Sequence, residues 1–167
     1  MLAEVKTLQR TEKNTVTLVI DSDTGTRYIR KELCGPHPIY AQLQALSHPY
    51  LPKIFHVEET RTGIVLIEEF IDGANLAEIT LPEKQAVALM EELCEVLVFL
   101  HSHGILHRDI KPSNLLLAAD GHIRLIDFDA AQEEKPSSDS DTRLLGTKGY
   151  APPEQYGFAQ TDARADI

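Results

Sequence analysis

The sequence predicts an α+β protein in which a strand-rich first part precedes a part built around one long helix. Residues 15–20 (TVTLVI) are β-branched and apolar, and a turn cluster at 21–25 separates them from a second strand at 28–33. Residues 82–103 carry apolar side chains three to four positions apart, which is typical of an amphipathic helix. Further on, Asp120-Gly121 lies between two apolar runs and predicts a β-hairpin.

Composition limits the classes of partner. The chain has 167 residues, 43% of them hydrophobic, which is enough to bury a core. Its 26 acidic and 16 basic side chains give a formal charge of −10. Nonspecific binding to nucleic acid or to an anionic membrane surface needs a basic field, so we expect neither partner.

The ends and the cysteines bear on location. The N-terminus has no signal-peptide pattern, and no apolar run approaches the ~20 residues that span a bilayer. Cys34 and Cys94 lie far apart without a CxxC spacing, so we expect reduced thiols that pack as small core residues. These features favour a soluble, cytoplasmic chain.

In the first part, residues 2–33 are predicted to form a strand meander. The two-residue period places Ile29, Lys31 and Leu33 on one face of the last strand. Residues 39–46 are compatible with a helix between two proline-containing breaks. Strands at 51–56 and 63–67 then complete a five-stranded sheet.

The long helix at 82–103 has clear ends. Pro82 and Glu83 suit its start, and Gly104 suits its end. We expect its core-facing stripe to consist of Val87, Met90, Leu93, Cys94, Leu97 and either Leu100 or His101. Residues 115–117 and 122–126 are the expected strands of the later hairpin.

The stretch His107-Arg108-Asp109-Ile110-Lys111-Pro112-Ser113-Asn114 carries the chemistry. It suits the transfer of a phosphoryl group to a hydroxyl. Asp109 can accept the hydroxyl proton, Lys111 can neutralise charge on the moving group, and Asn114 can hold a metal ion. A structural loop rarely needs so many reactive side chains in eight residues.

This octapeptide resembles the catalytic loop of Hanks-type, eukaryotic-like serine/threonine protein kinases, with Lys111 two residues after the aspartate. Asp127-Phe128-Asp129 resembles their Asp-Phe-Gly metal loop, and residues 146–154 resemble their substrate strip and Ala-Pro-Glu signature. The resemblance implies a protein-kinase-like two-lobe fold. Its N-lobe, at 1–71, would be a complete antiparallel sheet with one helix. The hinge between the lobes would lie at 68–72. Its C-lobe, at 72–167, would be partial and mainly helical, with a metal loop at 127–129 and an activation segment at 127–154.

The resemblance also implies residue roles. Asp109 and Lys111 would be catalytic, and Asn114 and Asp127 would hold Mg²⁺. The residues implied to contact ATP are Val16, Ile29, Lys31, Glu69, Ile71, Asn114, Leu116 and Asp127. Among them Lys31 would bind the α- and β-phosphates, and Leu116 would lie beneath the adenine.

The chain departs from the family pattern at several positions. The glycines of the family's phosphate-covering loop are replaced by Gln9, Thr11 and Asn14. Ile39 stands where the family has the helix glutamate that pairs with the strand lysine, so a partner for Lys31 must come from elsewhere. Glu68 at the gatekeeper position is one candidate. Asp129 replaces the glycine of the metal loop, which would limit its movement and add a carboxylate.

Two further expectations concern the last part. Asp166 matches the family aspartate that braces the catalytic loop at the start of the central C-lobe helix, and the resemblance stops there. We therefore expect a truncated catalytic domain of marginal stability, or self-association through an uncovered C-lobe face. Thr142 or Ser140, in a polar loop, would be a regulatory phosphosite that pairs with Arg108.

The sequence therefore favours a protein serine/threonine kinase that transfers the γ-phosphate of ATP to a protein hydroxyl. One alternative is a pseudokinase or nucleotide-binding interaction module that is inactive as this chain. Another is a small-molecule phosphotransferase, because residues 126–129 (IDFD) also fit that class. Lys111 and the strip at 146–154 favour a protein substrate over the small-molecule class.

Overall fold

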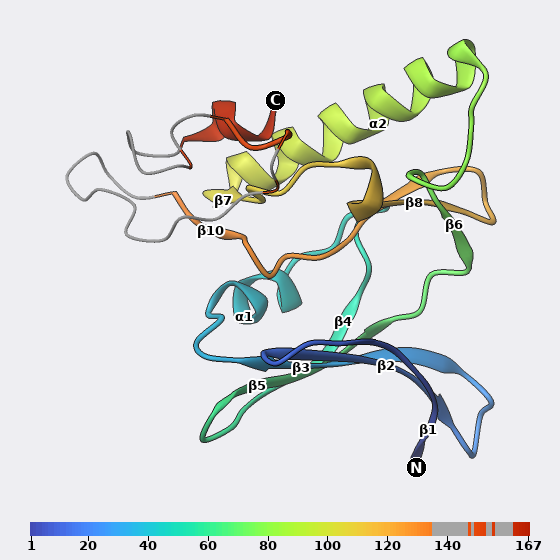
Figure 1. Ribbon diagram of the computed structural model, residues 1–167, viewed down its shortest axis with the longest axis vertical. Helices are drawn as coiled ribbons and strands as arrows, with labels where there is room; N and C mark the ends of the chain where they lie inside the picture. Colours follow the sequence, from blue (N-terminus) through green and yellow to red (C-terminus); the bar gives the residue numbers. More distant parts are fainter. Residues whose placement is uncertain (135–146, 148, 153–154, 156–161) are drawn as a thin grey trace. The chain divides into compact units, whose positions relative to one another are not determined.

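A computed structural model describes residues 1–134, 147, 149–152, 155 and 162–167. The chain divides into two compact units, Met1–Asp72 (unit 1) and Gly73–Ile167 (unit 2), and each is described by itself (Figure 1). Strands dominate unit 1, and unit 2 contains the long helix. The expected phosphosites Thr142 and Ser140 lie outside the described residues.

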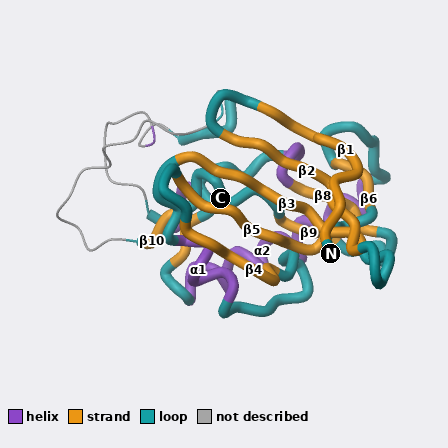
Figure 2. Tube along the Cα trace, turned by 90° about the horizontal axis from the view of Figure 1, so that it is seen from below, coloured by secondary structure: helices purple, strands orange, loops and turns teal. Residues whose placement is uncertain are grey.

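Unit 1 is a five-stranded antiparallel sheet with one helix, as predicted. The strands lie side by side in the order β1-β2-β3-β5-β4 (Figure 2). Helix α1 buries Ile39, Tyr40 and Leu43. The elements are β1 (Leu2–Arg10), β2 (Asn14–Asp21), β3 (Arg27–Cys34), α1 (Ile39–Gln44), β4 (Ile54–Glu59) and β5 (Gly63–Glu69).

The strand predicted at 51–56 is displaced in the structure, where β4 begins only at Ile54. Pro52 has no backbone N–H to give to a neighbouring strand. The backbone N–H of Leu51 is also used in a turn, because it donates to the His48 carbonyl at 3.1 Å. Pairing with β5 therefore starts after the proline and continues to Glu59.

Unit 2 combines helix α2 with short strands. Its elements are β6 (Gly73–Asn75), α2 (Glu83–Ser102), β7 (Ile105–Leu106), the 3₁₀ turn η1 (Pro112–Asn114), β8 (Leu115–Ala118), β9 (Ile123–Leu125), β10 (Gln132–Glu133) and the 3₁₀ turn η3 (Ala163–Asp166). Gly104 ends α2 with a φ of +68°, a backbone conformation that glycine adopts without strain. The expected hairpin is β8–β9, which β6 extends to three strands, and β7 and β10 form a separate two-stranded sheet. The sequence did not predict β6, β7 or β10.

The predicted core stripe of α2 is only half correct. The buried residues of the helix are Leu89, Leu93, Val96, Leu97 and Leu100. In contrast, Val87, Met90 and Cys94 are exposed. The helix has apolar residues on both faces, and it is the face against β7 and β9 that becomes buried.

Both cysteines differ from the prediction that they are core residues, because Cys34 and Cys94 are exposed free thiols. In the part of the chain that the structure describes, no helix is long and apolar enough to cross a membrane. Self-association through an uncovered face of unit 2 stays a prediction.

Candidate active site

The start of the catalytic loop is fixed by a buried carboxylate. Asp166 accepts hydrogen bonds from the backbone N–H groups of His107 at 2.9 Å and Arg108 at 2.6 Å, and lies 2.8 Å from Nε2 of His101. Arg108 has a φ of +67°, which costs energy for a residue with a side chain. The bonds to Asp166 hold this strained backbone, so the predicted bracing contact is present.

Directly after Arg108, three polar side chains meet at the Asp109 carboxylate. Its carboxylate lies 2.7 Å from Nζ of Lys111 and accepts a hydrogen bond from Nδ2 of Asn114 at 2.9 Å. It also accepts the hydroxyl hydrogen of Thr147 at 2.7 Å. The Lys111 ammonium in turn donates to the Thr147 hydroxyl at 2.7 Å. We call this group the Asp109 cluster.

The cluster keeps Asp109 ionised. Burial by itself would raise the pKa of this carboxyl, but the hydrogen bonds from Lys111, Thr147 and Asn114 outweigh it, so the pKa lies below its ordinary value. A carboxylate held as an anion can accept a proton from a hydroxyl group. Its low basicity also means that it acts on a proton only as the hydroxyl oxygen forms its new bond.

His107 links the catalytic loop to the metal loop. Its ring is fully buried, lies edge-on to Phe128 with 4.7 Å between ring centroids, and contacts the Ile126 carbonyl through Nε2 at 3.1 Å. Burial lowers the pKa of His107, with the charge of Asp166 opposing that shift. A neutral ring that donates from Nε2 and accepts the Asp109 N–H at Nδ1, 3.3 Å away, fits these contacts.

The two predicted metal ligands are connected through the backbone. The N–H of Ile126, next to Asp127, donates to the Asn114 carbonyl at 2.9 Å. Asp127 has a φ of +66°, a second strained position in this site. Its carboxylate accepts a long hydrogen bond, 3.4 Å, from the backbone of Asp129. Leu116, on β8, is half-buried opposite Arg124.

In unit 1, the register brings predicted ATP-contacting residues onto one face of the sheet. Val16 lies opposite Lys31, and Ile29 is two residues before Lys31 on the same strand. Ile29 also lies opposite Glu68 on β5. Nζ of Lys31 is 2.9 Å from Oε1 of Glu68, and both side chains are buried. The candidate partner named from the sequence is therefore in contact.

The segment after β5 carries the other two predicted residues. The backbone N–H of Glu69 donates to the Lys53 carbonyl at 2.8 Å, so this donor is already used within the sheet. Ile71 lies between two residues that Arg27 contacts. The guanidinium carbon of Arg27 is 4.4 Å from the centre of the Phe70 ring, and its Nη2 is 3.0 Å from the Asp72 carboxylate.

The β1–β2 turn, where the family has its glycine loop, is closed by a side chain. The Thr11 hydroxyl accepts hydrogen bonds from the backbone N–H groups of Asn14 at 2.9 Å and Lys13 at 3.3 Å. The Thr11 N–H donates to the Asn14 carbonyl at 2.8 Å. These bonds define a compact turn in place of a glycine-rich one.

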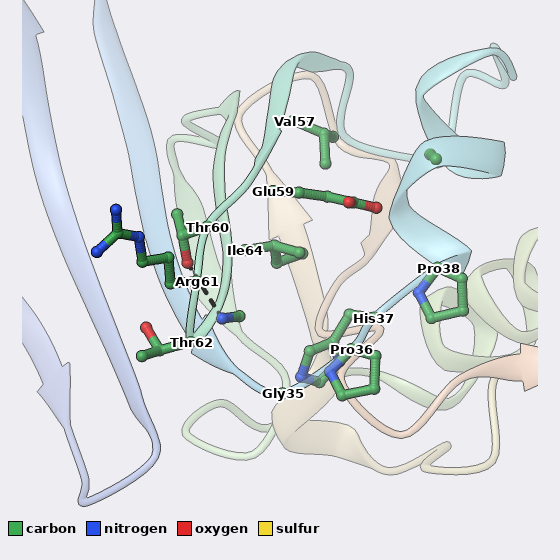
Figure 3. Close-up of a pocket in the computed structure, with 12 residues that line it drawn as sticks. Gly35, Pro36, His37, Pro38, Val57, Glu59, Thr60, Arg61, Thr62 and Ile64 are labelled. Atoms are coloured by element: carbon green, nitrogen blue, oxygen red, sulfur yellow. Dashed lines mark hydrogen bonds between the residues drawn. The ribbon is translucent and has the colours of Figure 1, made fainter.

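Unit 1 also has a cavity of about 370 Å³ between the β4–β5 hairpin and the loop before α1 (Figure 3). Its lining includes Gly35, His37, Glu59 and Thr60, and a hydrogen bond of 3.1 Å from Gly63 N–H to the Thr60 hydroxyl closes the hairpin. None of the predicted ATP-contacting residues lines this cavity. It is therefore a feature separate from those residues.

Sequence reasoning missed two contributors to the loop. Thr147 had no role of its own in the sequence analysis beyond its place in the strip at 146–154, yet its hydroxyl bonds both Asp109 and Lys111. Gln155 is buried and donates from Nε2 to the Arg108 carbonyl at 2.9 Å. The signal for Thr147 was its place in the Gly146-Thr147 pair of the strip at 146–154, whereas nothing in the sequence marked Gln155.

Known proteins match this chain over most of its length. The protein kinase domain family matches residues 37–167. Serine/threonine-protein kinase PknB of Mycobacterium leprae is 28% identical over 163 residues, which cover 87% of this chain and 26% of that protein. PknB of Mycobacterium tuberculosis (strain ATCC 25618 / H37Rv) is 28% identical over 169 residues, covering 90% of this chain and 27% of that protein.

A relative from an animal shares more identity over a shorter stretch. Protein kinase C zeta type of Oryctolagus cuniculus is 35% identical over 126 residues, which cover 70% of this chain and 21% of that protein. The chain thus spans about a quarter of the length of these relatives. The family match covers the catalytic loop, the metal loop and the strip after it. This chain belongs to the protein kinase domain family.

Proposed function

We propose that this chain carries the catalytic site of a protein serine/threonine kinase that uses ATP and Mg²⁺. The observation that carries the proposal is the Asp109 cluster, in which an ionised carboxylate is held by a lysine, an asparagine and a threonine within 2.9 Å. Membership of the protein kinase family and the names of the relatives support the same reaction.

Each residue of the cluster has a chemical task. The Asp109 carboxylate accepts the proton of the substrate hydroxyl as its oxygen attacks the γ-phosphorus. The Lys111 ammonium, beside it, opposes the negative charge that spreads over the transferred group. Thr147 bridges the two side chains and keeps their separation constant, which matters because phosphoryl transfer depends chiefly on positioning.

Asn114 and Asp127 fit a magnesium ion. Magnesium prefers oxygen ligands and supplies charge neutralisation on the ATP phosphates when it is bound. The side-chain amide nitrogen of Asn114 donates two hydrogen bonds to Asp109, one to its backbone carbonyl at 2.8 Å and one to its carboxylate at 2.9 Å. The amide oxygen of Asn114 therefore faces away from Asp109 and is suited to a cation. Among the described residues, the Asp127 carboxylate has only the long contact to Asp129, which leaves it able to bind a metal.

A protein substrate is supported over a small molecule. The two features that separate protein kinases from the small-molecule class in the sequence are Lys111 and the strip that contains Thr147. Both contact the same Asp109 carboxylate. The acceptor is therefore proposed to be a serine or threonine of a protein, and a cytoplasmic location stays a prediction.

The test measures ATP binding with and without Mg²⁺, followed by phosphate transfer to a generic basic protein. Wild-type chain should bind ATP in a magnesium-dependent manner, and Asp127→Asn should abolish that dependence. Asp109→Asn should retain binding and lose transfer by about 10²–10⁴-fold. Absence of magnesium-dependent binding would contradict the proposal. Wild-type binding without transfer would favour the alternative, a nucleotide-binding module.

A further inference from the structure

Lys31 and Glu68 form a buried ion pair inside unit 1. The Lys31 Nζ and Glu68 Oε1 atoms are 2.9 Å apart, and the two side chains are 8% and 9% exposed. Removing charges from water is costly unless they are paired closely. A pair of this kind therefore fixes the position of each partner much more strongly than a surface ion pair does.

Helix α1 has no carboxylate to offer this lysine. No Asp or Glu occurs in the sequence between Glu32 and Glu58, a stretch that includes α1 and both of its flanking loops. The helix instead directs an aromatic ring toward the ammonium group, with the Tyr40 ring centroid 5.9 Å from the Lys31 Nζ. The helix thus supplies packing, and the negative charge comes from β5.

The sheet itself holds the two charges together. Because Glu68 lies opposite Ile29 and Leu66 lies opposite Lys31, Glu68 and Lys31 are diagonal neighbours on one face of the β3–β5 pair. Strand β5 is paired on both sides, with Ile54 of β4 also opposite Glu68. The carboxylate therefore cannot move away from Lys31 by a shift of its backbone without disrupting two strand pairings.

We propose that Glu68 is the positioning residue that holds Lys31 for the phosphates of the nucleotide, and that this hold does not depend on α1. The inference rests on the proposed function, because it concerns the ATP-contacting role of Lys31. In protein kinases the ion pair that orients this lysine joins it to a helix, and the helix position controls activity. Here both partners lie on neighbouring strands, so control by displacement of α1 is lost. An ammonium group has three N–H donors, so a bond to Glu68 does not by itself exclude bonds to phosphate oxygens.

The experiment compares the affinities of the whole chain for Mg·ATP and for adenosine by calorimetry. Glu68→Gln keeps the shape of the side chain and removes its charge. It should weaken Mg·ATP binding at least about tenfold, because the Lys31 ammonium loses the carboxylate that lies 2.9 Å from it. Adenosine binding should be unchanged, since adenosine has no phosphate for Lys31, whereas general damage to the sheet would weaken both ligands. Glu68→Asp, which retains a carboxylate, should restore part of the affinity for Mg·ATP.

Two control variants test the remaining parts. Glu32→Gln removes the same charge from an exposed position on β3, and it should leave both affinities unchanged. Ala41→Gly/Gln44→Gly loosens α1 at exposed positions and removes the 3.3 Å contact from Gln44 to the Phe55 carbonyl. That variant should bind Mg·ATP as the wild type does.

Equal Mg·ATP affinities for folded Glu68→Gln and Glu32→Gln would overturn the inference. Tighter Mg·ATP binding by Glu68→Gln than by the wild type would also overturn it, because Glu68 would then be holding Lys31 away from the phosphates. If Glu68→Gln does not fold, the comparison of Glu68→Asp with the wild type decides. If Ala41→Gly/Gln44→Gly loses as much Mg·ATP affinity as Glu68→Gln does, the position of Lys31 depends on α1 and that part of the inference is refuted. A wild-type chain that binds no Mg·ATP would contradict the proposed function itself, which the other outcomes leave intact.

Discussion

The Thr147 hydroxyl stands between the two charged groups of the catalytic loop. It accepts a hydrogen bond from Lys111 and donates one to Asp109, each at 2.7 Å. The direct distance between the Lys111 ammonium and the Asp109 carboxylate is also 2.7 Å. The three groups form a closed triangle, in which the position of each is set by the other two.

Removing this hydroxyl is expected to slow phosphate transfer. Thr147→Val keeps the β-branched shape but provides neither the donor nor the acceptor, so Asp109 and Lys111 lose a shared partner. The rate should fall by up to about a hundredfold, as for other small displacements of catalytic groups, with little change in ATP affinity. Thr147→Ser retains the hydroxyl and should keep most of the activity. Steady-state kinetics of the wild type and both variants measures the effect. Equal transfer rates for Thr147→Val and Thr147→Ser would show that the hydroxyl has no catalytic effect.

Lys111 is also expected to control the pH dependence of transfer. Burial would raise the pKa of Asp109, and the hydrogen bond from Lys111 is the foremost effect that lowers it. The base acts when it is unprotonated. Protonation of Asp109 should therefore reduce kcat/KM of the wild type only at pH values below those at which carboxyl groups ordinarily titrate. In Lys111→Met the pKa should rise, so the acid limb of kcat/KM should move to higher pH. Profiles of the two proteins with coincident acid limbs would contradict this.

The catalytic residues that sequence reasoning found are those whose contacts are local in the chain. Asp109, Lys111 and Asn114 lie within six residues, so a short loop brings them together whatever surrounds it. Thr147 and Asp166 reach the same loop from far along the chain, and only Asp166 was predicted to do so, through the family resemblance. Such contacts depend on how later segments return, and no hydrophobic period marks such a return.

The face of α2 that is buried could not be chosen from the sequence for a related reason. Met90 and Leu93 are both apolar at helical spacing, and either could lie over a core. The choice depends on the strands that pack against the helix, which bury Leu93 and leave Met90 at 42% exposure. In unit 1 the alternating pattern of β3 was more informative, because the strand period placed Ile29, Lys31 and Leu33 on one face correctly.

His107 is expected to make the stability of the chain depend on pH. Burial lowers the pKa of this ring, so the folded chain stays unprotonated where the unfolded chain, with an ordinary pKa of 6.5, takes up a proton. Above pH 6.5 the His107 ring does not make the free energy of unfolding depend on pH. Below pH 6.5 the free energy of unfolding decreases as pH falls, by up to about 1.4 kcal/mol per pH unit.

Denaturant unfolding between pH 7.5 and 5.5 measures this slope. His107→Gln should flatten it, while His56→Gln, at a side chain that is 60% exposed, should leave it unchanged. A slope in His107→Gln as steep as in the wild type would assign the pH dependence to other groups.

Asp166 is expected to be the most sensitive position for the integrity of the catalytic loop. Its carboxylate satisfies the buried backbone N–H groups of His107 and Arg108, and its side chain is fully buried. Asp166→Ala should therefore leave two buried donors unpaired and release the strained φ at Arg108, at a cost of about 3 kcal/mol. Asp166→Asn retains one acceptor oxygen and should lose less. Amide hydrogen exchange at residues 107 and 108 reports the effect locally: in Asp166→Ala both amides should exchange much faster than in Asp23→Ala, a change at a surface carboxylate. Unchanged protection of these amides in Asp166→Ala would mean that the loop holds its strained conformation without the carboxylate.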